Sequence, residues 1–181
     1  LELASVRDRA LIWLLYCPAL RVNEALSLQW PEDVDLTRGL VRFLGKQRVE
    51  PEAHDLPAPA IEALEAWLAK RGRAPGALFA RRRKRHGKSR TAIGQRQAWR
   101  IVHDLGEKAG VDNACPHGLR HSGITTAARE TNGDAFKTRQ FARHSSVETS
   151  TIYIHSADDE RRQTLEAVGA ALAKRCNGES K

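Results

Sequence analysis

Most of this 181-residue chain has apolar residues at the spacing of an α-helix, and only one short stretch has the character of β-structure. Leu11, Leu14 and Leu15 share one face of a segment that Ser5 can cap and that ends near residue 17. Residues 33–46 instead contain strand-forming residues on both sides of a turn at 37–39. The chain is therefore expected to adopt a predominantly helical α+β fold with a small sheet.

Further helices are expected along the rest of the chain. The segment that Thr91 can cap and that ends at Lys108 should direct Trp99 and Val102 inward. Residues 51–59 do not separate clearly into strand and loop. The other expected helices cover approximately residues 22–28, 60–70, 118–131, 135–142, 148–155 and 158–174.

The overall charge indicates a polyanionic partner. Thirty Lys and Arg residues against 22 Asp and Glu give a net charge of +8, which favours nucleic acid. No apolar run approaches the roughly 18 residues of a membrane span, and no signal peptide is evident, so we expect a cytoplasmic protein that does not contact membranes. The three cysteines are scattered and fit neither a disulfide framework nor a metal site.

The segment from Arg143 to residue 155 carries a histidine and a tyrosine on either side of an expected helix start. Ser145 and Glu148 have the spacing of a capping box, so His144 should precede the helix and Tyr153 should lie on it or just past its end. Tyrosine can act as a covalent nucleophile, and a nearby imidazole can stabilise a developing anion. A buried tyrosine with a hydrogen-bonded hydroxyl explains this segment equally well.

Other residues suited to bind a phosphate are spread along the chain. His117 and Arg120 stand three apart at an expected helix start, although such pairs are common on helix surfaces. Arg21 and Glu24 have the same spacing, and by themselves indicate a surface ion pair. Lys46 by itself is an ordinary turn lysine, and His121 is interpreted as structural.

A strongly basic run covers residues 81–90 and should form a solvated loop. Such a run either keeps the protein in solution or contacts DNA phosphates, and the basic composition of the chain favours the second interpretation. The predicted DNA-binding residues are Arg81, Arg82, Arg83, Lys84, Arg85, Lys88 and Arg90.

Taken together, these positions resemble the catalytic domain of the tyrosine recombinases, the phage-integrase type of site-specific DNA recombinase. The sequence ALRVNEALSL at 19–28 is similar to the G-L-R-x-x-E-x-x-x-L element of that family, and HGLRH at 117–121 is similar to its H-x-L-R-H element. Residues 144–146 and 153–155 are similar to its G-H-S-S and Y-x-H elements. The order and spacing agree over about residues 5–156.

The chain departs from this family pattern in three places. Ala19 and Arg143 stand where the family has glycine. Lys46 is similar to a β-turn lysine of the family, but the region after it is shorter than the family's G-K-G-x-K-x-R stretch.

The resemblance implies a fold with a small antiparallel three-stranded sheet and a reaction that needs neither a cofactor nor a metal. Tyr153 would attack the scissile phosphate and form a 3′-phosphotyrosyl intermediate. Lys46 would protonate the leaving 5′-oxygen, and Glu24 would hold Arg21. In the same implied site, the phosphate would be clamped by Arg21, Arg120 and His144, and His117 would accept the tyrosine proton or support the group that does.

The resemblance also bears on domains and partners. Residues 1–181 would form the catalytic domain, and because the chain lacks methionine and begins at Leu1, we expect it to be cut from a longer protein with a preceding DNA-clamping domain. The partner would be a double-stranded recombination site bound by a homotetramer on two duplexes. Residues 157–181 would dock on a neighbouring protomer or pack on their own domain, and the sequence favours neither.

Two other functions remain open from the sequence. A type IB topoisomerase shares the tyrosine, both arginines and a histidine, but relaxes DNA without exchanging strands between partners. A DNA-binding protein could also keep the fold without catalysis. The G-H-S-S-like and H-x-L-R-H elements favour the recombinase over the topoisomerase. The non-catalytic protein is disfavoured because none of the six matched positions, Arg21, Lys46, His117, Arg120, His144 and Tyr153, is missing.

Overall fold

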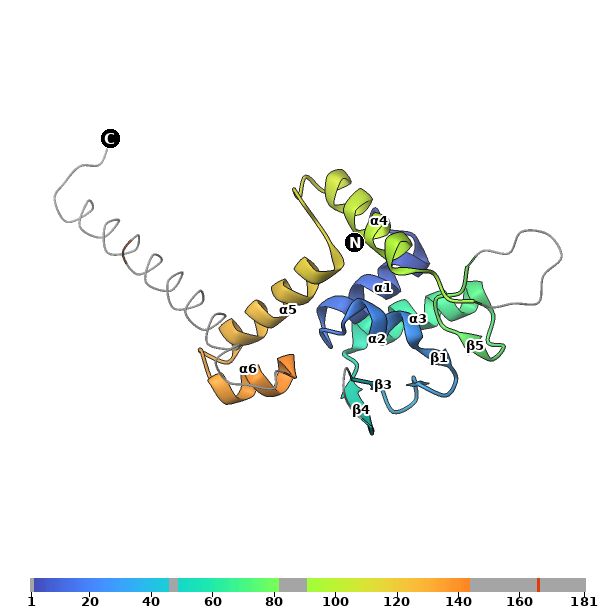
Figure 1. Ribbon diagram of the computed structural model, residues 1–181, viewed down its shortest axis with the longest axis horizontal. Coiled ribbons are helices and arrows are strands. Elements are labelled where there is room, and N and C mark those ends of the chain that lie inside the picture. Colours follow the sequence, from blue (N-terminus) through green and yellow to red (C-terminus); the bar gives the residue numbers. More distant parts are fainter. Residues whose placement is uncertain (1, 46–48, 82–90, 144–165, 167–181) are drawn as a thin grey trace. The chain divides into compact units, whose positions relative to one another are not determined.

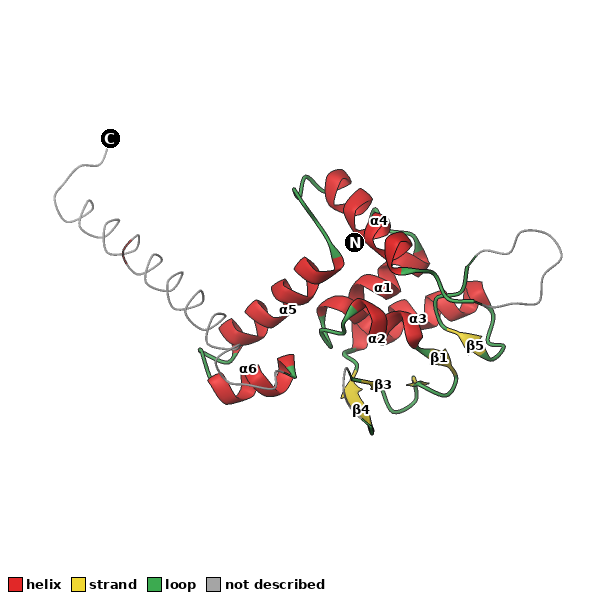
Figure 2. Ribbon diagram, in the orientation of Figure 1, coloured by secondary structure: helices red, strands yellow, loops and turns green. Residues whose placement is uncertain are grey.

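A computed structural model describes residues 2–45, 49–81, 91–143 and 166, and shows a mainly helical α+β fold (Figures 1 and 2). The helices in the described part are α1 (Val6–Tyr16), α2 (Val22–Ser27), α3 (Ala58–Arg71), α4 (Gln95–Lys108), α5 (Pro116–Glu130) and α6 (Ala135–Ala142). The strands are β1 (Gln29–Trp30), β2 (Val34–Asp35), β3 (Leu40–Leu44), β4 (Pro51–Asp55) and β5 (Gly76–Ala77). The expected helices at 148–155 and 158–174 lie outside the described residues.

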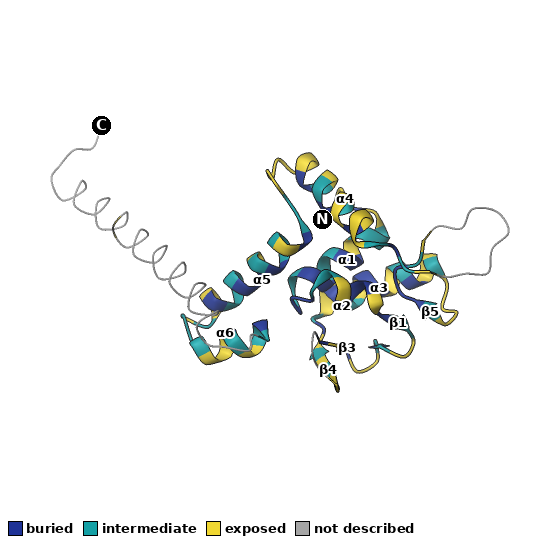
Figure 3. Cartoon of the chain, viewed as in Figure 1, coloured by how far each residue is buried: buried dark blue, intermediate teal, exposed yellow. Residues whose placement is uncertain are grey.

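Helix α1 forms the centre of the core and begins where the sequence predicted. The Ser5 hydroxyl accepts a hydrogen bond from the amide of Asp8 at 3.3 Å, which satisfies one of the free donors of the first turn. The predicted apolar face, Leu11, Leu14 and Leu15, is fully buried (Figure 3). Helix α1 packs against α3 and α2, and this packing fixes the turn at residues 17–21 that joins α1 to α2.

The predicted small sheet is present as an antiparallel sheet with the order β2-β3-β4. Val34 pairs with Val41, and Leu44 at the end of β3 pairs with Pro51 at the start of β4. The turn between β2 and β3 uses Gly39, whose φ of 66° suits a residue without a Cβ. Residues 51–55, where the sequence did not separate strand from loop, form strand β4 because they pair with β3. A second, two-stranded sheet joins β1 to β5.

The start of α4 differs from the sequence prediction. The helix begins at Gln95 with Gly94 as its N-cap, because the residues before it are paired in extended conformation. The carbonyl of Thr91 accepts the amide of Arg81 at 2.9 Å, and an isolated bridge joins Ala80 to Ala92. Thr91 is therefore not a helix cap.

The orientation of Trp99 on α4 was also predicted wrongly. Its side chain is 48% exposed, whereas Val102 one turn later is buried as expected. The Trp99 ring stacks on the His103 ring, with 4.5 Å between the ring centroids. This local stacking partner lets the indole remain at the surface.

Helix α5 begins at Pro116, two residues before the expected start. Proline suits the first helical position, and the Sγ atom of Cys115 accepts the amide of Gly118 at 3.3 Å. Further along, Gly123 lies so close to α1 that a Cβ there would collide with the carbonyl oxygen of Tyr16. The first two turns of α5 are thus held against the end of α1.

Two compact units divide the chain, Leu1–Gly123 and Ile124–Lys181. In the second unit, α6 begins and ends where predicted. Asp134 caps it by accepting the amides of Phe136 and Lys137, each at 3.0 Å, and these bonds lower the pKa of its carboxyl. Arg143 ends α6 in the left-handed conformation, with a φ of 55°.

The described cysteines, Cys17 and Cys115, are free thiols, and burial raises the pKa of Cys17. None of the described helices is long and apolar enough to cross a membrane.

Candidate functional site

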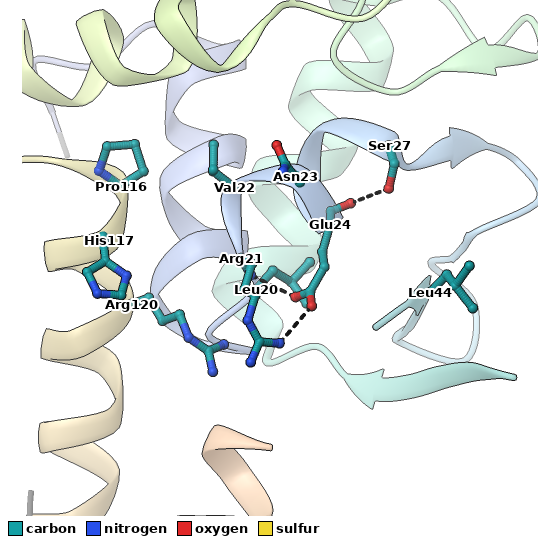
Figure 4. A pocket seen from close by; sticks show the side chains of 10 residues that line it. All are labelled: Leu20, Arg21, Val22, Asn23, Glu24, Ser27, Leu44, Pro116, His117 and Arg120. Atoms are coloured by element: carbon teal, nitrogen blue, oxygen red, sulfur yellow. Dashed lines mark hydrogen bonds and ion pairs between the residues drawn. The ribbon is translucent and has the colours of Figure 1, made fainter. Parts of the chain in front are cut away.

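A hollow of about 630 Å³ in the first unit collects several of the residues singled out by the sequence (Figure 4). It lies between the start of α2, the end of β3 and the first turns of α5. Its lining residues are Leu20, Arg21, Val22, Asn23, Glu24, Ser27, Leu44, Pro116, His117 and Arg120. Two guanidinium groups, one carboxylate and one imidazole therefore share a single surface depression.

Arg21 is held at the start of α2 by Glu24. The Arg21 guanidinium donates to one carboxylate oxygen of Glu24 at 2.9 Å, and the Arg21 backbone amide donates to the other at 2.7 Å. The Glu24 side chain is 5% exposed, whereas that of Arg21 is 39% exposed. A buried carboxylate needs such partners, because a lone buried charge is costly. The arrangement anchors one part of the Arg21 guanidinium and leaves the residue partly open to the hollow.

Arg120 reaches the hollow from α5 and is anchored at the α1–α2 turn. The residue is buried, at 5% exposure, and its guanidinium donates a hydrogen bond to the backbone carbonyl of Ala19 in the α1–α2 turn. Ala19 has a positive φ of 48°, which is uncommon for a residue with a side chain. Arg120 and Arg21 are thus tied to the same short turn, and both guanidinium groups point the same way in Figure 4.

His117 precedes Arg120 by one turn of α5 and also contacts His121. The Nε2 atoms of the two histidines are within hydrogen-bonding distance, and the rings meet edge to face with centroids 4.0 Å apart. Burial, followed by the charges of His117 and Arg120, lowers the pKa of His121. The sequence assigned His121 a structural role, and its contact with His117 was missed although a spacing of four residues places both on one helix face.

The chemistry of this hollow suits an oxyanion. A guanidinium offers several N–H donors in a fixed plane, which matches two oxygens of a phosphate, and it stays charged at any physiological pH. Two such groups beside an imidazole provide a cationic surface that can stabilise negative charge as it develops on a bound phosphate. These side chains suit a phosphodiester better than a neutral ligand.

The structure brings together four of the predicted site residues and leaves three unplaced. Arg21, Glu24, His117 and Arg120 line the hollow. The other three lie outside the described residues, namely Lys46, His144 and Tyr153. Leu44, two positions before Lys46 in the sequence, is itself part of the lining.

Arg81 is the one described member of the predicted basic loop, and it lines a second hollow of about 430 Å³. Arg96 and Arg100 on α4 line the same depression, together with Gly94, Gln97, Ile101 and Asp104. The sequence prediction missed both α4 arginines, although their spacing of four residues places them on one helix face. The remaining predicted loop residues, Arg82, Arg83, Lys84, Arg85, Lys88 and Arg90, lie outside the described residues.

One group of possible metal ligands occurs in the described part of the chain. His103, Asp104 and Glu107 on α4 have ligand atoms within 4.8 Å of one another. Both carboxylates are exposed, and none of the three residues lines the hollow of Arg21 and Arg120.

The sequence of residues 2–160 matches the model of the phage integrase family. The chain belongs to this family. Among its relatives, the tyrosine recombinase XerD of Neisseria meningitidis serogroup A is 34% identical over 161 residues, covering 85% of this chain and 52% of the relative. The tyrosine recombinase XerA of Thermococcus kodakarensis is 31% identical over 173 residues, covering 96% of this chain and 58% of the relative. This chain thus spans little more than half the length of these relatives.

Solved structures agree with the family assignment. The crystal structure of XerA recombinase superposes with a TM-score of 0.72 at 27% identity, covering 88% of this chain and 57% of that structure. The crystal structure of XerH site-specific recombinase bound to palindromic difH substrate, a post-cleavage complex, gives a TM-score of 0.69 at 26% identity. The match covers 88% of this chain and 45% of that one. The α+β fold predicted from the sequence, with its small antiparallel sheet, is confirmed.

Proposed function

We propose that this chain is the catalytic domain of a site-specific DNA recombinase that cleaves and rejoins strands through a 3′-phosphotyrosyl intermediate. The observation that carries the proposal is the shared hollow of Arg21, His117 and Arg120. Each arginine is fixed by a partner, Glu24 for one and the Ala19 carbonyl for the other. Preorganised cations of this kind stabilise a transition state without further reorganisation, which favours catalysis over simple binding.

In this reaction the phosphate would occupy the hollow between the two guanidinium groups. Tyr153 Oη attacks the phosphorus, the P–O5′ bond breaks, and the new P–O bond to tyrosine conserves the phosphodiester. Arg21, Arg120 and His144 donate to the non-bridging oxygens, where negative charge accumulates. Rejoining is the reverse reaction with a different 5′-hydroxyl, so neither ATP nor a cofactor is consumed.

Two proton transfers complete the step. His117 accepts the proton of the Tyr153 hydroxyl, and Lys46 donates a proton to the departing 5′-oxygen, which would otherwise leave as an alkoxide. The position of Leu44 in the lining of the hollow supports this role for Lys46, because only Gly45 separates the two residues in the sequence.

Duplex DNA would be held by the basic residues outside the hollow. Arg81, Arg96 and Arg100 line one depression, and residues 82–90 continue the basic run. Lys and Arg contacts to phosphates supply affinity that does not depend on sequence. The recombining assembly would be a homotetramer on two duplexes, with residues 157–181 docked on a neighbouring protomer, and it would act on DNA in the cytoplasm.

A nicked suicide substrate tests the proposal. After cleavage such a DNA loses its short 5′-hydroxyl fragment, so the covalent protein–DNA adduct accumulates and is visible on a denaturing gel. The parent chain should form the adduct and Tyr153→Phe should not. The chain has two tyrosines, so Tyr16→Phe serves as a matched control that should keep the adduct.

A further inference from the structure

The contact between His117 and His121 requires the two imidazole rings to carry their protons in a defined way. Both Nε2 atoms take part in it, so one nitrogen must donate and the other must accept. Two protonated Nε2 atoms at this separation would repel each other. The contact therefore requires at least one of the two rings to be neutral, with its proton on Nδ1.

Several features favour His121 over His117 as the neutral acceptor. Burial comes first among the causes that lower its pKa, and the charges of His117 and Arg120 add to it. His117 is exposed and lines the hollow, where Arg21 and Glu24 are the other charged groups together with Arg120. A proton shared by the pair is thus better hydrated on His117 than on His121.

We propose that His121 is a positioning residue that accepts a hydrogen bond from Nε2–H of His117. This bond fixes the His117 tautomer and leaves the lone pair on its Nδ1. The same logic operates wherever a catalytic base is oriented by a third group. When His117 Nδ1 takes a proton, its ring becomes an imidazolium, and the Nε2–H bond to neutral His121 strengthens as a charge-assisted bond.

The catalytic consequence rests on the proposed function, whereas the hydrogen bond itself does not. In the proposed reaction the proton leaves the Tyr153 hydroxyl and arrives at His117 Nδ1, while the oxygen keeps the electron pair that forms the bond to phosphorus. His121 neither gains nor loses a proton in this step. It makes His117 the stronger base by stabilising the protonated ring.

Nuclear magnetic resonance on the DNA-free chain tests the hydrogen bond. A ¹⁵N-labelled sample at neutral pH should show a scalar coupling between the Nε2 nuclei of His117 and His121, with the proton attached to the His117 nitrogen. His121→Phe should abolish the coupling, whereas His103→Gln on α4 should retain it. A proton attached to His121 instead, or no coupling in the parent chain, would overturn the proposal.

The pH profile of adduct formation tests the effect on His117. His121→Phe removes the acceptor that stabilises the protonated His117 ring. The acid limb of the profile should then move to lower pH, and the plateau rate should drop by about tenfold, which is part of the rate enhancement that a general base supplies. His121→Gln offers an amide oxygen as acceptor and should restore most of the rate.

Equal loss of rate at every pH in both variants would mean that His121 has only a structural role. If the parent chain forms no adduct at all, the proposed function fails while the coupling measurement still decides the hydrogen bond.

Discussion

Arg120 donates a hydrogen bond to the backbone carbonyl of Ala19, a residue 101 positions earlier in the chain. This bond joins the first turns of α5 to the turn between α1 and α2, from which Arg21 extends. The two arginines of the hollow are therefore held by one local framework. A change to either end of this bond should alter the site without touching the proposed nucleophile.

Replacing Arg120 should abolish cleavage and leave most DNA binding intact. Arg120→Ala removes one phosphate clamp and leaves a buried carbonyl without this donor, at a cost of about 1–3 kcal/mol in folding stability. Arg120→Lys keeps the charge but not the planar fork, so it should recover binding better than cleavage. Adduct yield and a DNA mobility shift, measured on the same samples, separate the two effects. Parallel loss of both activities would assign Arg120 to anchoring or folding alone.

Ala19→Gly should stabilise the chain. Ala19 has a φ of 48°, a left-handed conformation that costs an L-residue roughly 1–2 kcal/mol and glycine much less. The greater freedom of glycine in the unfolded chain offsets part of this, so a net gain of about 0.5–1 kcal/mol is expected. Denaturant unfolding of the two proteins measures it. A loss of stability would show that the methyl group contributes packing that outweighs the backbone strain.

Glu24→Gln should weaken cleavage through Arg21. The amide can accept one of the two hydrogen bonds that Glu24 makes with Arg21, but it lacks the charge that holds the guanidinium at 2.9 Å. We expect about a tenfold or greater drop in adduct rate, equivalent to the ~1.4 kcal/mol of a single charged contact. Glu65→Gln on the exposed face of α3 is the matched control and should leave the rate unchanged. Indistinguishable rates for the two variants would exclude this role of Glu24.

Arg100→Ala should weaken DNA binding uniformly across sequences. Removing one phosphate contact lowers the slope of log affinity against log salt by about 1. Lys108→Ala, at the other end of α4 and outside the depression lined by Arg81, removes the same charge and should change the slope less. Affinities measured by fluorescence anisotropy over a range of salt concentrations test this. Identical slopes for the two variants would show that only overall charge matters.

Local patterns predicted the parts of the fold that depend on neighbouring residues. Ser5 and the apolar spacing of Leu11, Leu14 and Leu15 suffice to define α1. Thr91 was misread as a cap because its backbone pairs with Arg81, ten residues earlier, and no local pattern reveals that pairing. Trp99 was expected inside because of its apolar spacing on the helix. Its stacking on His103 at the surface cannot be recognised from that spacing.

The candidate site shows the same division between local and distant contacts. The Arg21 and Glu24 pair follows from a spacing of three residues within one helix start. The bond from Arg120 to Ala19 joins distant parts of the chain, and the sequence did not indicate it. The two positions where the family resemblance has glycine, Ala19 and Arg143, both adopt positive φ, which gives a physical reason for glycine there.

The most direct test of the central claim is the chemical identity of the trapped adduct. Digestion of the complex formed with a nicked suicide substrate, followed by mass spectrometry, should locate the DNA on the peptide that contains Tyr153, linked through a 3′-phosphate. An adduct on Tyr16, an adduct that persists in Tyr153→Phe, or a 5′-phosphate linkage would contradict the proposed function.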